Sequence, residues 1–165
     1  MKLTKSKLKQ VIREEIQKMN EAKTYADAMA GTNIDVSSKG ITSLEGAPQK
    51  VEGRFYCDNN SLTSLKGAPK EVKGSFHCYN NSLTSLKDAP QKVEGSVYCD
   101  NNSLTSLKGA PQKVKGDFYC YNNSLTSLEG APKEVEGDFY CQKNKTKFTE
   151  EDVRAVCKVG GRILV

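Results

Sequence analysis

The chain has 165 residues, a length typical of one domain, and only 36% of them are apolar. So small an apolar share disfavours a compact globule with a thick core and favours an elongated repeat structure with a thin one. The net charge of +5 lies mainly at the N-terminus, where residues 1–24 carry +4, so the nearly neutral remainder argues against a phosphate-binding surface.

The N-terminal segment predicts an amphipathic helix. Apolar residues recur at helical spacing from Leu8 to Met19, and we expect a helix over residues 4–21, followed by an Ala-rich stretch to residue 31. Polar residues interrupt the apolar ones, so neither a secretory signal nor a membrane span is expected, which favours a bacterial cytoplasm or a virion. Residues 1–31 are interpreted either as a cap over the first repeat or as an arm that docks on a partner or another copy. The opening MKLTKSKLKQVIREE resembles the N-terminal segments of tailed-phage proteins.

The centre of the chain is an internal repeat of 21 residues. Three residue types recur at this spacing: Cys57, Cys78, Cys99, Cys120 and Cys141; Pro48, Pro69, Pro90, Pro111 and Pro132; and Asn60, Asn81, Asn102, Asn123 and Asn144. Such a repeat predicts a solenoid over residues 32–148, in which each turn covers its neighbour.

Within each repeat, the alternation of apolar and polar residues predicts one short strand. Phe76 and Cys78 alternate with Ser75, His77 and Tyr79, so the first two are expected inside and the other three outside. The pattern extends one turn towards the N-terminus and gives about six turns. Strands are therefore expected near residues 33–37, 54–58, 75–79, 96–100, 117–121 and 138–142.

The F-x-C-x-x-N-x-L-x-x-L pattern of residues 76–86 resembles the leucine-rich repeat signature, and its longer form, G-x-F-x-C-x-x-N-x-L-T-S-L-x-G-A-P, resembles repeat proteins of bacteria and their phages. The resemblance covers roughly residues 33–148. It implies a parallel sheet on the concave side, a non-helical convex side, and a ladder of buried asparagines that bond the backbone of their own and adjacent turns. Val72 lies four residues before Phe76, one more than the spacing usual in leucine-rich repeats, and we interpret the intervening Lys73-Gly74 pair as a bulge.

Residues 149–165 predict a C-terminal cap. Thr149 followed by three acidic residues is a typical helix start. Val153, Val156 and Cys157 would share one face, and the Gly160-Gly161 pair is expected to end the helix. A last strand is expected from the apolar residues 163–165.

The cysteine row is interpreted as structural. One thiol per turn forms a straight line, whereas tetrahedral zinc needs four sulfurs that converge on one point. Parallel neighbours are also poorly placed for disulfides, so each cysteine is expected to be a small buried apolar residue. No metal and no cofactor are predicted.

The outward face of the expected sheet is the candidate binding site. Its first row consists of Tyr56, His77, Tyr98, Tyr119 and Tyr140, and its second row consists of Asp58, Tyr79, Asp100, Tyr121 and Gln142, flanked by Asn59, Asn80, Asn101 and Asn122. Tyrosine rows suit recognition, although they can also serve only to stack across strands. The charged residues of the face sum to −2, which argues against nucleic acid as a ligand.

Catalysis finds little support in the sequence. The single histidine, His77, has no nucleophile beside it on its face, and no phosphate-binding loop or serine elbow occurs. We expect a non-enzymatic scaffold that recognises a protein or a glycan through the tyrosine face. The alternative is a structural subunit of a phage particle or a self-assembling filament, joined through the N-terminal helix or the solenoid ends.

Overall fold

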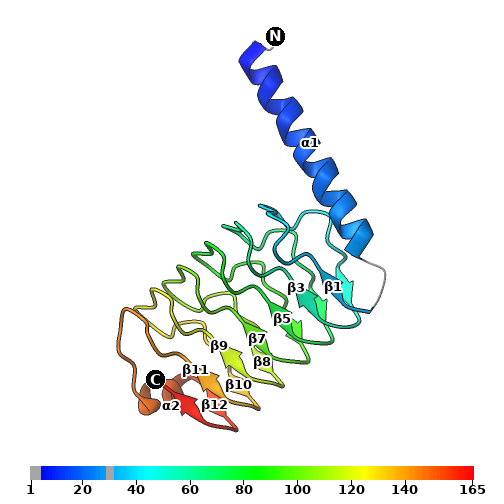
Figure 1. The fold of residues 1–165 in the computed structure, drawn as a ribbon. Coiled ribbons are helices and arrows are strands. Elements are labelled where there is room, and N and C mark those ends of the chain that lie inside the picture. Colours follow the sequence, from blue (N-terminus) through cyan, green and yellow to red (C-terminus); the bar gives the residue numbers. More distant parts are fainter. Residues whose placement is uncertain (1–4, 29–31) are drawn as a thin grey trace.

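The structure is a computed structural model that describes residues 5–28 and 32–165, and it shows a parallel β-solenoid of about six turns with two helices (Figure 1). One sheet contains β1 (Ile34–Asp35), β3 (Phe55–Tyr56), β5 (Phe76–His77), β7 (Val97–Tyr98), β9 (Phe118–Tyr119), β11 (Phe139–Tyr140) and β13 (Ile163–Leu164). The other contains β2 (Lys50–Val51), β4 (Glu71–Val72), β6 (Lys92–Val93), β8 (Lys113–Val114), β10 (Glu134–Val135) and β12 (Lys158–Val159). The helices are α1 (Lys5–Ala28) and α2 (Glu150–Val156).

The seven-stranded sheet confirms the six strands predicted from the repeat, although each is only two residues long, and β13 adds the expected last strand. Equivalent residues pair across successive turns, as Phe55 does with Phe76. The six-stranded sheet was not predicted. Each of its strands has one buried valine beside one charged residue, which is too short a pattern to reveal a strand by alternation.

The Lys73-Gly74 pair, which the sequence suggests as a bulge, lies between β4 of one sheet and β5 of the other and forms the corner between the two sheets. The Gly74 N–H donates to the Gly53 carbonyl of the preceding turn at 2.8 Å. A Cβ atom at Gly74 would lie 2.7 Å from the Arg54 nitrogen, which is closer than side chains pack against backbone. The repeated glycine therefore lets successive turns approach at this corner.

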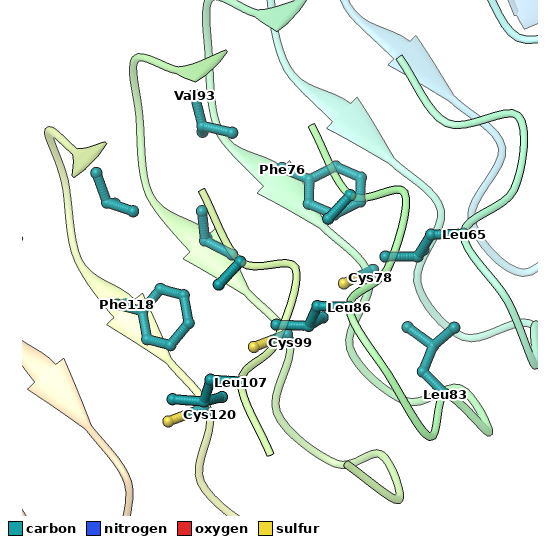
Figure 2. Packing of buried hydrophobic residues seen from close by; sticks show 14 of the residues in the cluster. Leu65, Phe76, Cys78, Leu83, Leu86, Val93, Cys99, Leu107, Phe118 and Cys120 are labelled. Atoms are coloured by element: carbon teal, nitrogen blue, oxygen red, sulfur yellow. The ribbon is translucent and has the colours of Figure 1, made fainter. Parts of the chain in front are cut away.

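The core lies between the two sheets and runs the length of the solenoid (Figure 2). Each of the four turns between Phe55 and Val135 contributes one phenylalanine or valine from the seven-stranded sheet, a cysteine, two leucines, and a valine from the other sheet. In one turn these are Phe118, Cys120, Leu125, Leu128 and Val135, all of them buried. The phenylalanines also contact one another across turns, with the ring centroids of Phe118 and Phe139 5.3 Å apart. Because each turn covers the apolar side chains of its neighbour, few apolar residues are enough to form a thin continuous core.

The predicted asparagine ladder is confirmed. The Asn102 side-chain amide donates to the carbonyls of Cys78, Cys99 and Asp100 at 3.0–3.3 Å, and its Oδ1 accepts from the Leu83 N–H at 3.0 Å. One side chain therefore satisfies backbone groups of its own turn and of the preceding turn. The residue before it, Asn101, has a left-handed backbone with φ of 52°, a conformation that asparagine tolerates well.

A row of charges that alternate from turn to turn directly follows the strands of the six-stranded sheet. The row runs Glu52, Lys73, Glu94, Lys115 and Glu136. Lys115 contacts Glu94 at 3.4 Å, and the two lysines beside Glu52 hold the pKa of its carboxyl at about 2. Alternation avoids like charges on adjacent turns of this row, although pairs this exposed add little stability.

Helix α2 begins as predicted but ends earlier. The Thr149 hydroxyl accepts from the Asp152 N–H at 3.2 Å, and the Asp152 carboxylate accepts from the Thr149 N–H at 2.8 Å, which is a capping box. The helix ends at Val156 because Cys157 has an extended backbone and leads directly into β12. Gly160-Gly161 therefore lies beyond β12 and does not end the helix. Val153 and Cys157 are buried, whereas Val156 is exposed.

Helix α1 is longer than predicted, because it continues through the Ala-rich stretch to Ala28. It projects away from the first turns of the solenoid (Figure 1). The predicted start at residue 4 and Met29 lie outside the described residues. Neither described helix combines the length and the apolar character needed to cross a membrane.

Candidate functional site

The first outward row is a continuous stack of rings. From Tyr56 through His77, Tyr98 and Tyr119 to Tyr140, adjacent ring centroids lie 4.3–4.5 Å apart, and the planes of the last three pairs differ by 10° or less. The in-register parallel pairing of the strands produces this spacing. The rings therefore stabilise the sheet and present their edges, not their faces, to solvent.

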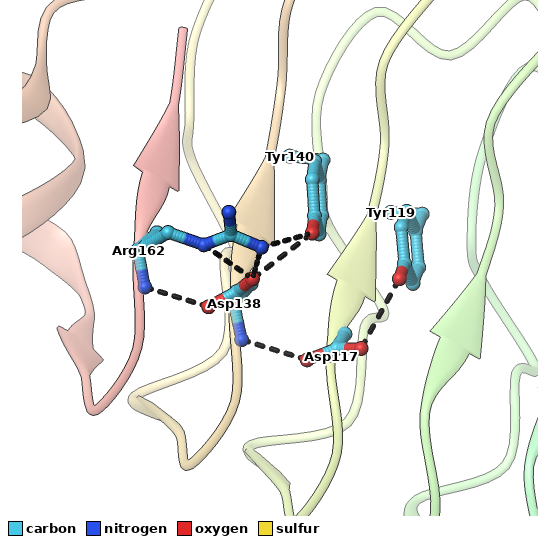
Figure 3. Close-up of polar contacts among 5 residues, drawn as sticks. All are labelled: Asp117, Tyr119, Asp138, Tyr140 and Arg162. Carbon is cyan, nitrogen blue, oxygen red and sulfur yellow. Dashed lines mark hydrogen bonds and ion pairs between the residues drawn. The ribbon is translucent and has the colours of Figure 1, made fainter.

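The hydroxyls at the C-terminal end of this row are held by carboxylates (Figure 3). Tyr119 donates to Asp117 at 3.1 Å, and Tyr140 donates to Asp138 at 2.9 Å. Arg162 binds the same Asp138 oxygen through two side-chain nitrogens, at 2.7 and 3.0 Å, which holds the pKa of the Asp138 carboxyl at about 2. The hydroxyls at this end of the row are thus already engaged in hydrogen bonds within the protein.

The second row is organised differently from the prediction. Asp58 and Asp100 were expected on the outer surface, but each is only 4% exposed. The following asparagine donates to each carboxylate, Asn59 to Asp58 at 2.7 Å and Asn101 to Asp100 at 2.6 Å. These asparagines therefore cover the two carboxylates and reduce their exposure to solvent.

Tyrosines separate the two buried carboxylates. Burial and a hydrogen bond to Asp58 raise the pKa of Tyr79, and burial and the charge of Asp100 raise the pKa of Tyr121. Strands in a sheet lie about 4.8 Å apart, so carboxylates on adjacent turns would repel each other strongly. Alternation with tyrosine places the two aspartates two turns apart, which explains the double-repeat period of this row.

A hollow of about 490 Å³ opens on this face around Asp100. Tyr79 and Tyr121 come from the turns before and after Asp100, and their larger side chains leave a depression at the smaller aspartate. The complete lining consists of His77, Tyr79, Asn80, Tyr98, Asp100, Asn101, Tyr119 and Tyr121. Burial raises the pKa of Asp100 above its ordinary value, and hydrogen bonds from Tyr121 and Asn101 oppose that shift.

The hollow brings together six of the nine predicted site residues. Tyr56, Asp58 and Tyr140 lie outside its lining. Asn80 and Asn101, which the sequence places beside the second row, complete it. The site therefore offers a carboxylate acceptor, amide donors and acceptors, phenol hydroxyls and ring edges around one hollow.

The cysteines lie away from this face and are all free and buried, as predicted. Burial raises the pKa of Cys141 and of Cys157 to about 11, so neither thiol is a nucleophile at neutral pH. Among the described residues, no cluster of three His, Cys, Asp or Glu side chains is placed to hold a metal ion.

His77 makes the stability of the solenoid dependent on pH. Burial lowers its pKa below the ordinary 6.5, and its Nε2 is buried without a hydrogen-bond partner among the described residues. As the pH falls through 6.5, the unfolded chain takes up this proton more readily than the folded chain, so stability decreases. We expect unfolding by urea to need less denaturant at about pH 5 than at about pH 7. The variant His77→Tyr, which has the residue usual in this row, should show a smaller decrease; an equal decrease would contradict the assignment.

Comparison of the chain with models of protein families, with curated proteins and with solved structures found no match. Its function is therefore inferred from the site itself.

Proposed function

We propose that the chain is a non-enzymatic binding scaffold that recognises a glycan through the hollow around Asp100. The proposal includes the leucine-rich-repeat character of the chain, of the short type found in bacteria and phages, with the seven-stranded sheet on the concave side. Repeat proteins generally bind ligands on such an extended face. The observation that carries the proposal is the hollow itself, which combines a buried carboxylate with amides and phenols.

The chemistry of the lining favours a sugar over an apolar ligand. The hollow has a volume of about 490 Å³, which lies within the range of small-molecule sites. Sugar hydroxyls both donate and accept hydrogen bonds, and Asp100, Asn80 and Asn101 supply acceptors and donors at one place. A carboxylate acceptor strengthens each bond it receives, and the surrounding rings exclude water from it. A protein partner would need a broader contact than this hollow provides.

Two matched variants test the site. Asp58 and Asp100 are equally buried, and each accepts from the asparagine that follows it, but only Asp100 lines the hollow. The full chain is screened on an array of immobilised bacterial and plant glycans, and the affinity for the strongest ligand is then measured by calorimetry. We expect Asp100→Asn to weaken binding about 10- to 100-fold, the loss of one charge-assisted hydrogen bond, and Asp58→Asn to change it little.

The alternatives give different results. An array on which no glycan binds would overturn the glycan proposal and direct attention to protein ligands. Equal losses in the two variants would show that binding depends on the stability of the second row and not on the hollow. Because burial raises the pKa of Asp100, its ionised form is disfavoured by the fold, and Asp100→Asn should not destabilise the protein at neutral pH.

A further inference from the structure

The apolar stripe of α1 is exposed to solvent. Leu8, Ile12, Ile16 and Met19 are 48–71% exposed, and Val11 is 41% exposed. These residues recur at spacings of three and four, so they lie on one side of the helix. A contiguous apolar stripe of this size on an otherwise polar helix is typical of an interaction site.

The opposite side of α1 faces the solenoid. Arg13, Glu14 and Gln17 line a cleft of about 540 Å³ together with Thr42 and Glu45 of the first turn. Residues 13 and 17 lie roughly half a helical turn away from Leu8 and Met19. The helix is therefore oriented with its polar side towards the repeats and its apolar stripe away from them.

We infer that this stripe is covered by α1 of a second copy of the chain, with the two helices antiparallel. A single helix that projects into solvent obtains little stability from its own hydrogen bonds, and most helices in proteins depend on burial of an apolar side. Leu8, Ile12 and Ile16 form one row at intervals of four residues, and that row is symmetrical about Ile12. An antiparallel copy paired at Ile12 places Leu8 against Ile16 of the other copy.

The charges of the segment favour the antiparallel orientation. In the sequence, residues 2–13 contain five basic and no acidic residues, whereas residues 14–21 contain three acidic residues and one basic residue. A parallel pair would place the two basic halves side by side. It would also place Glu15, which falls within the stripe, against Glu15 of the other chain. The antiparallel pair places each basic half beside an acidic half, which favours association.

The same residues argue against a lipid surface as the occupant. Glu15, an acidic residue, lies within the stripe, and no aromatic side chain occurs among residues 6–20. Helices that lie in a membrane interface usually have an uninterrupted apolar side, often with aromatic residues. There is also room for a second copy, because α1 extends beyond the solenoid and an antiparallel partner would place its own repeats at the far end (Figure 1).

This association is independent of the glycan site and adds to it. Two copies joined through α1 present two hollows, and a ligand with repeated sugars would bind such a pair more tightly than a single copy. Self-association through this helix also agrees with the structural subunit that the sequence offers as the alternative function.

The first test is the size of the full chain in solution, measured by light scattering after chromatography. We expect a dimer that Ile12→Lys converts to a monomer. Gln10→Lys is the matched control, because it introduces the same charge on the other side of the helix, where Gln10 already contacts Glu14 at 3.0 Å. A monomeric wild-type chain, or equal dissociation by both variants, would overturn the proposal. Flotation of the wild-type monomer with phosphatidylserine vesicles would identify lipid as the occupant instead.

The second test distinguishes the two orientations by crosslinking. The native cysteines are buried in the solenoid, so a cysteine placed on α1 reacts without competition from them. On mild oxidation, a mixture of Leu8→Cys and Ile16→Cys should give covalent dimers, and each variant alone should give few, because the two positions face each other only in the antiparallel pair. Covalent dimers formed as readily by each variant alone as by the mixture would contradict the antiparallel arrangement.

Discussion

Replacing Asn102 by Ala is expected to lower the free energy of unfolding by about 3 kcal/mol, because buried backbone groups in two turns lose their hydrogen-bond partner. Its amide nitrogen donates to three carbonyls and its oxygen accepts from the Leu83 N–H. Asn102→Asp should be similarly harmful although it has the same shape, since a carboxylate cannot donate to those carbonyls.

The measurement is equilibrium unfolding in urea, followed by circular dichroism. Ser103→Ala serves as the control, because the Ser103 side chain is exposed and adjacent, and it should change the free energy by no more than about 0.5 kcal/mol. A change of similar size for Asn102→Ala would show that solvent can satisfy these groups and that the ladder is dispensable.

The largest loss of stability is expected for Phe118→Ala, at about 3–5 kcal/mol. The side chain is fully buried, contacts Phe139, and fills the space between the sheets (Figure 2). Val97 has the equivalent position in the preceding turn, so this layer already accepts a smaller residue there.

Phe118→Leu should therefore cost clearly less than Phe118→Ala, because leucine refills part of the cavity. Both variants are compared with the wild-type chain by urea unfolding. An effect of Phe118→Ala below about 1 kcal/mol would mean that the turns collapse around the gap, and it would contradict a closely packed solenoid core.

The strands of the seven-stranded sheet could be predicted because each repeat contains a period-two pattern and the 21-residue spacing places it in every turn. The second sheet could not, since Val72 and its equivalents stand alone between charged and glycine residues. The available signal was the row of Glu52, Lys73, Glu94, Lys115 and Glu136, in which charges of opposite sign alternate every 21 residues, which indicates side chains that meet across turns.

The sequence predicted which face of the sheet carries the site. It did not predict that Asp58 and Asp100 are buried or that a hollow forms around Asp100. Asp58 and Asp100 were assigned to the surface by the period-two alternation of the strands, whereas Asn59 and Asn101 cover them in the structure. The signal for their burial was the alternation of aspartate with tyrosine along the second row. A carboxylate that occurs only on every second turn indicates that carboxylates on adjacent turns would repel each other. The position of the hollow also depends on which side chains are small, and this becomes clear only when the strand register is known.

The most direct test of the proposed site is amide NMR of the 15N-labelled full chain during titration with the saccharide that binds best on the array. We predict that the largest shifts lie in the turns around the hollow, at His77 to Asn80 and Tyr98 to Asn101, and that Asp100→Asn needs about 10- to 100-fold more saccharide to reach them. Shifts centred on α1 or on the six-stranded sheet, or an Asp100→Asn titration that follows the wild-type curve, would contradict the proposed site.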